Sequence, residues 1–69
     1  MNQIFAEHVR RQLDVWHHEI RYAEKNGMTE EARIFRAQAA AYRMGLEAVL
    51  NSRLVERIFE GYDFGGDEA

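Results

Sequence analysis

The chain has 69 residues, of which twelve are acidic and nine basic, so its formal net charge is −3, and it contains no cysteine. A chain of this length forms one small domain, whose core alone supplies only about 3–5 kcal/mol of stability. The lack of cysteine excludes disulfide bonds and thiolate metal sites and is typical of a reducing compartment. We therefore expect self-association to supply the stability that such devices supply in other small domains.

The distribution of charge and hydrophobicity limits the partners and the location. No apolar run of the roughly 18 residues that a membrane span needs occurs, and the first residues lack the basic and then apolar order of a signal peptide. We expect no membrane contact and a cytoplasmic location. Residues 1–60 carry nine basic and nine acidic side chains, so the whole net charge lies in residues 61–69. Because a neutral body does not attract phosphate backbones strongly, nucleic acid is not expected as a partner.

A first helix is predicted over about residues 2–25. Apolar residues recur there at spacings of three and four, which is the pattern of one helix face, and they are Phe5, Val9, Leu13, Trp16, Ile20 and Ala23. Asn26 and Gly27 predict its end, because glycine adopts the left-handed conformation after a helix without steric cost.

A second helix is predicted over about residues 30–60. Thr29 is expected to be its N-cap, and Glu30 and Glu31 are favoured in its first turn by the exposed amides and the helix dipole. Since the connection is so short, the two helices should form an antiparallel hairpin. The residues expected to face the first helix are Phe35, Ala39, Tyr42, Leu46 and Val49.

The second helix carries another apolar stripe, roughly 120° from the first when residues are projected at 100° each. Its members are Ile34, Ala37, Ala41, Gly45 and Ala48. Glycine inside a helix costs about 1 kcal/mol relative to alanine, so Gly45 is best explained where another backbone approaches closely. The alternative is that the alanines serve helix propensity and that Gly45 has no role.

The predicted second helix is also longer than the first, about 46 Å against about 36 Å at 1.5 Å per residue. Its overhang would expose several large apolar residues. Either the chain bends at Asn51 and Ser52 into a short third helix, or a second subunit covers the overhang. We adopt the second alternative, which predicts an all-α homodimer that forms a four-helix bundle. The predicted self-association residues are Ile34, Ala37, Ala41, Gly45, Ala48, Leu54, Val55, Ile58 and Phe59.

No catalytic, cofactor-binding or metal-binding residues are predicted. His8, His17 and His18 are the only side chains that titrate near neutrality without perturbation, and Asp14 is spaced to contact His17 or His18 on one helix. These positions lie away from the core stripe, and the inward positions of the second helix are apolar, so a bundle metal site has no ligands. A surface ion pair or solvated imidazoles are expected instead.

Residues 61–69 differ from the helical domain of residues 1–60, because three of the nine are glycines and three are acidic. They predict a flexible acidic tail that orders on a basic, apolar groove of a partner. The predicted partner-binding residues are Tyr62, Asp63, Phe64, Asp67 and Glu68. The alternative is that Tyr62 and Phe64 fold back on the end of the second helix.

These features together predict a non-enzymatic interaction protein that dimerises and binds another protein. In its size and its cysteine-free, arginine-rich composition, the chain is similar to the accessory proteins that bacteriophages make to bind and redirect host proteins. That resemblance implies a small regulator, inhibitor or adaptor. Two alternatives remain open, a small helical DNA-associated regulator and a structural subunit of a larger assembly in which the small-residue stripe packs on a foreign helix.

Overall fold

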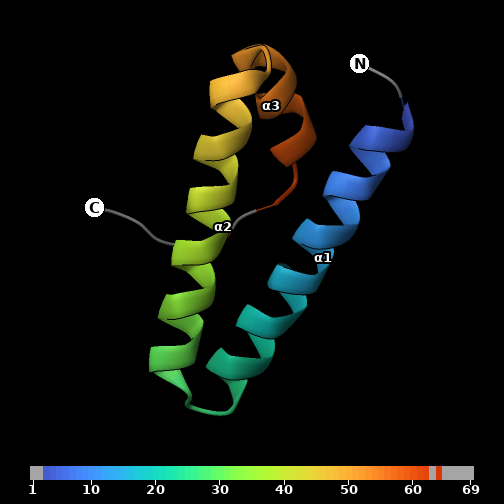
Figure 1. Ribbon diagram of the computed structural model, residues 1–69. Helices are drawn as coiled ribbons and strands as arrows, with labels where there is room; N and C mark the ends of the chain where they lie inside the picture. Colours follow the sequence, from blue (N-terminus) through green and yellow to red (C-terminus); the bar gives the residue numbers. More distant parts are fainter. Residues whose placement is uncertain (1–2, 63, 65–69) are drawn as a thin grey trace.

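The computed structural model describes residues 3–62 and residue 64, and these form three helices and no strand. Helices α1 (Gln3–Lys25) and α2 (Thr29–Val49) run antiparallel as a hairpin, and α3 (Ser52–Phe59) folds back against both at the open end (Figure 1). The predicted all-α class is confirmed. None of these helices is long and apolar enough to cross a membrane.

The turn between α1 and α2 is built on Gly27, which has a φ of 73°. The amide of Met28 donates to the carbonyl of Ala23 at 2.8 Å, and the amide of Gly27 donates to that of Glu24 at 3.2 Å. This pair of bonds is the Schellman arrangement, which satisfies the last carbonyls of a helix. The prediction that Thr29 is the N-cap is wrong: α2 begins at Thr29 itself, and Met28 stands at the N-cap position without a side-chain cap. The reason is that the backbone of Met28 already closes the turn, so no residue is left between turn and helix.

The core runs between the hairpin helices and under α3. Most of the predicted α1 stripe is buried, but Phe5 is 38% exposed and the neighbouring Ala6 is buried instead. On α2, Ala32 and Ala39 are each only 1% exposed, which shows that α1 covers this face closely. Val49, which was predicted to face inward, is 76% exposed because it lies in the last turn of α2, where the chain leaves the hairpin.

The predicted continuous helix over residues 30–60 is wrong, because the chain bends after Val49. Leu50 is extended, with φ −121° and ψ 162°, and Asn51 caps α3 by accepting a hydrogen bond from the amide of Arg53 at 2.8 Å. Because of the bend, three large side chains of α3 pack against Val9, Leu13 and Leu46 of the hairpin. The three are Val55, Ile58 and Phe59. The overhang is therefore covered by the chain itself, and the alternative of a short third helix is the correct one.

Candidate interaction surfaces

The first candidate surface is the side of α2 that points away from α1, here called the outer face. It consists of the predicted small-residue stripe and Met44, and all of its residues are exposed: Ile34, Ala37, Ala41, Met44, Gly45 and Ala48. None of the six carries a charge. Met44 is 70% exposed and Ile34 is 46% exposed, so the face presents apolar side chains to solvent over about four turns.

Gly45 lies within this face and inside α2, where glycine is unfavourable. A Cβ atom at Gly45 would meet no atom of the described residues within 4 Å beyond its own helix turn. The packing of residues 3–62 and 64 therefore gives no steric reason for a glycine here. This distinguishes Gly45 from Gly27 and Gly61, whose positive φ angles of 73° and 91° favour glycine.

The other predicted self-association residues are not on the outer face. Val55, Ile58 and Phe59 are at most 5% exposed and belong to the core of the single chain, and Leu54 is half-buried and packs against that core. We correct the prediction accordingly and leave these four residues out of the self-association surface. The physical reason is the bend after Val49, which turns them toward α1.

The second candidate surface contains the C-terminal strap, defined here as Gly61, Tyr62 and Phe64. The positive φ of Gly61 turns the chain back after α3, and the amide of Tyr62 donates to the carbonyl of Phe59 at 3.0 Å. The Tyr62 hydroxyl then donates to a carboxylate oxygen of Asp14 on α1 at 2.7 Å. Burial of the phenol, and next the hydrogen bond to Asp14, raise the pKa of Tyr62 above its ordinary value.

Aromatic contacts hold the strap on the hairpin. The Tyr62 and Phe64 rings are stacked, with centroids 6.1 Å apart, and the His17 ring lies edge-on to each of them at 6.4 Å. Phe64 also lies edge-on to Phe59 at 6.4 Å. These separations are in the range in which aromatic pairs attract. Tyr62 and Phe64 thus fold back on the chain, as the alternative interpretation of the tail proposed, whereas Asp63, Asp67 and Glu68 lie outside the described residues.

A cleft of about 270 Å³ lies between α2 and this strap. Arg36 and Arg43 stand on its wall, and the remaining lining residues are Ala39, Ala40, Phe59, Tyr62 and Phe64. A guanidinium nitrogen of Arg36 pairs with Glu24 of α1. The Nε atom of Arg43 donates to Glu47 at 3.2 Å, and its guanidinium carbon lies 5.0 Å from the centroid of the Phe59 ring. The arginines are therefore fixed at the cleft by ion pairs and by a cation–π contact.

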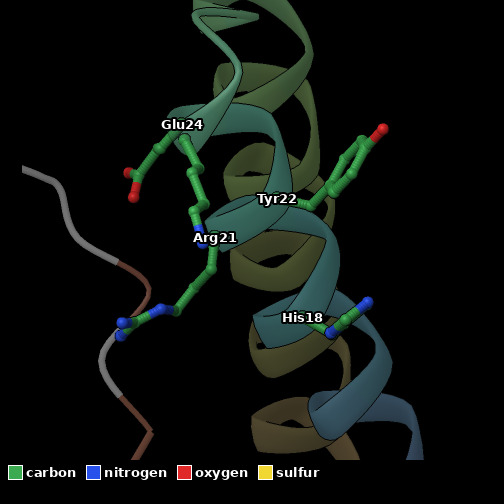
Figure 2. A pocket seen from close by; sticks show the side chains of 5 residues that line it. His18, Arg21, Tyr22 and Glu24 are labelled. Atoms are coloured by element: carbon green, nitrogen blue, oxygen red, sulfur yellow. The ribbon is translucent and has the colours of Figure 1, made fainter.

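A larger depression of about 580 Å³ lies along α1 and is lined by His18, Arg21, Tyr22, Glu24 and Lys25. All five residues come from one helix. Figure 2 shows Arg21 and Glu24 extending to the opposite side from His18 and Tyr22. Because these side chains diverge, they do not surround a common ligand position, and the depression is not a convincing site.

The histidines form no site with Asp14, whose carboxylate accepts the hydrogen bond from Tyr62 instead. Within residues 3–62 and 64, no group of three or more metal-ligating side chains lies close enough to hold a metal ion. Comparisons with models of protein families, with curated proteins and with solved structures find no match to this chain. The functional argument therefore depends on the outer face, the strap and the cleft.

Sequence reasoning found the outer face but missed the cleft. The signal that was available is the spacing of Arg36 and Arg43, two turns apart on one side of α2 with Ala39 and Ala40 between them. The contact between Tyr62 and Asp14 had no such signal, because the two residues are 48 positions apart in the sequence.

Proposed function

We propose that this chain is a non-enzymatic helical interaction protein that forms a homodimer through the outer face of α2 and binds another protein through the surfaces that the dimer leaves open. The observation that carries the proposal is Gly45, which lowers the stability of α2 by about 1 kcal/mol relative to alanine, although no described residue lies close enough to require a glycine there. A second helix that approaches closely at this point supplies the missing reason.

A two-fold axis near Ala41 gives the outer face a self-complementary shape. In an antiparallel pair with Ala41 opposite its own copy, Ile34 of each chain stands opposite Ala48 of the other. Ala37 then stands opposite Gly45. Each larger side chain meets a smaller one, which is what close packing of two helices requires. The four long helices of the two chains would then pack together, and each chain would keep its own α3 on its hairpin.

The residues beyond the dimer face are the proposed contacts to another protein. Tyr62 and Phe64 serve first to hold α3 on the hairpin, so we assign the contact with a basic partner chiefly to Asp63, Asp67 and Glu68, which lie outside the described residues. In this proposal the dimer acts as a small regulator, inhibitor or adaptor, the role that its resemblance to bacteriophage accessory proteins implies.

The homodimer is tested by measuring the solution mass with light scattering for the wild type, Gly45→Leu and Ala40→Leu. Ala40 is the matched control because it is exposed on α2 but lines the cleft rather than the outer face. We expect twice the chain mass of 8.1 kDa for the wild type and for Ala40→Leu, and a folded monomer for Gly45→Leu. A wild type that remains a folded monomer at all concentrations would overturn the homodimer, and a Gly45→Leu dimer would move the interface elsewhere.

A further inference from the structure

The cleft between α2 and the C-terminal strap has a positively charged wall. Among the described residues that line it, Arg36 and Arg43 are the only charged ones. Their counter-ions, Glu24 and Glu47, are not lining residues. Ala39 and Ala40 lie between the two arginines in the sequence and contribute only methyl groups to the lining.

Within residues 3–62 and 64, the two arginines make fewer hydrogen bonds than their guanidinium groups can donate. A guanidinium group carries five N–H bonds, and the ion pairs described above join each arginine to one glutamate. The Nε atom of Arg36 is buried and has no acceptor within residues 3–62 and 64. A buried donor without an acceptor is unfavourable, so the hydrogen bonding of this guanidinium group is incomplete within the described part of the chain.

The aromatic side of the cleft strengthens ionic contacts made inside it. Phe59, Tyr62 and Phe64 supply that side; the first is buried and the other two are half-buried, so ring surface lies beside the arginines. A charged hydrogen bond beside such apolar surface is stronger than the same bond in bulk solvent. The cleft thus combines two guanidinium groups with an aromatic wall.

We propose that the cleft is a carboxylate-binding site in which Arg36 and Arg43 hold one carboxylate between them, beside the rings of Phe59, Tyr62 and Phe64. Arginine suits this ligand because its planar fork of donors matches the two carboxylate oxygens. The proposal does not depend on the homodimer, since the cleft is separate from the outer face.

The carboxylate has two possible sources, which share this chemistry. One is the chain itself, since Phe64 lines the cleft and Asp67 follows it by three residues, a span of at most about 11 Å. An attached carboxylate acts at an effective concentration in the millimolar range, above that of most free ligands. The other source is an acidic side chain of another protein.

The test follows the side-chain Nε–Hε signals of Arg36 and Arg43 by nuclear magnetic resonance. They are compared between the wild type and the variant D63N/D67N/E68Q, in which all acidic residues of the tail are neutralised, and each protein is titrated with acetate. The signal of Arg53, an exposed arginine at the start of α3, is the internal control. Ala40→Leu places a larger side chain in the cleft at an exposed position and serves as the blocked variant.

If the chain supplies the carboxylate, the Arg36 and Arg43 signals differ between wild type and variant, and acetate moves the variant signals back in a saturable manner. If another protein supplies it, the tail variant changes nothing, but acetate shifts both signals saturably in the wild type and not in Ala40→Leu. The proposal is overturned if acetate gives no saturable shift of the Arg36 and Arg43 signals in the tail variant. It is also overturned if acetate shifts the Arg53 signal as much as these two signals, or shifts them as much in Ala40→Leu as in the wild type.

Discussion

The inner face of α2, which consists of the buried residues Ala32, Ala39 and Leu46, and the outer face are both apolar, yet only the outer face is exposed. Ala39 on the inner face is 1% exposed, whereas Ala41, two residues later, is on the exposed side. Leu46 is 8% exposed and Met44 is 70% exposed. The inner face owes its burial to α1 and α3, which pack on it.

Small residues of this helix stand in two different environments, one inside the packed chain and one in solvent. On the inner face, Ala32 and Ala39 let α1 come close, and that role is fulfilled inside the chain. On the outer face, Gly45 leaves room that none of the described residues fills. If the proposed dimer forms, the outer face becomes a second inner face, so substitutions on the two faces should respond differently to protein concentration.

The largest difference is expected from truncating one large side chain on each face. Leu46→Ala should lower the free energy of unfolding by about 2–5 kcal/mol, because it removes buried methyl groups and leaves a cavity. Met44→Ala should change it by less than about 0.5 kcal/mol in dilute solution, since the side chain is in water. Urea denaturation at low protein concentration measures both. Equal losses would contradict the assignment of the two faces.

The converse substitution enlarges a small residue on each face. Ala39→Leu should destabilise the chain by about 1–3 kcal/mol, because Ala39 is only 1% exposed and a larger side chain must displace the residues packed around it. Ala41→Leu makes the same change of helix propensity two residues away and should leave the unfolding free energy of the dilute protein nearly unchanged. Thermal unfolding followed by circular dichroism compares the pair. If Ala41→Leu proves as harmful as Ala39→Leu in the dilute monomer, the outer face is not free.

The hairpin could be predicted from the sequence because its signals are local. The three-and-four spacing from Val9 to Ala23 places a stripe on one helix face, and Gly27 supplies the conformation that ends the helix. The exposure of Ala37, Ala41 and Gly45 followed from the same projection, since a single hairpin partner covers only one side of a helix.

The break after Val49 could not be predicted from periodicity. The apolar spacing continues through Val55, Ile58 and Phe59, because α3 has a stripe of its own, so a straight helix and a bent one give the same pattern. The cap at Asn51 was the local signal for the bend. The position of the strap could not be predicted without the bend, because Tyr62 can approach Asp14 only after the chain turns back.

A smaller effect is expected where the strap meets α1. Tyr62→Phe removes the hydroxyl that donates to Asp14 and should lower the free energy of unfolding by about 0.5–1.5 kcal/mol, the net worth of one hydrogen bond. Tyr22→Phe is the matched control, because Tyr22 is 56% exposed on α1. Chemical denaturation of both variants measures the difference. No loss in Tyr62→Phe relative to Tyr22→Phe would show that the ring contacts alone hold the strap.

The same hydroxyl gives stability a dependence on alkaline pH. The pKa of Tyr62 is raised above 10.0 in the folded chain, chiefly by burial and then by Asp14. The neutral phenol therefore contributes its stability in full below the unfolded pKa near 10, and this contribution is lost as the pH rises through the higher folded pKa. We expect the wild type to lose stability more steeply than Tyr62→Phe in this range, and its tyrosinate absorbance to show a late step that the variant lacks. Parallel curves for the two proteins would rule out a perturbed Tyr62.

The smallest effect, Gly45→Ala, distinguishes the two faces by its sign. In the dilute chain a Cβ atom at Gly45 clashes with none of the described residues, so alanine should stabilise α2 by about 0.5–1 kcal/mol through helix propensity. In the dimer the same Cβ atom occupies the space that the second helix requires, and the dimer should weaken. Melting temperature measured against protein concentration separates the two effects, because only an associating protein becomes more stable when concentrated. The melting temperature of the wild type should rise with protein concentration. The melting temperature of Gly45→Ala should be higher in dilute solution but should change little with concentration. Parallel concentration dependences would mean that Gly45 serves neither the monomer nor the proposed interface.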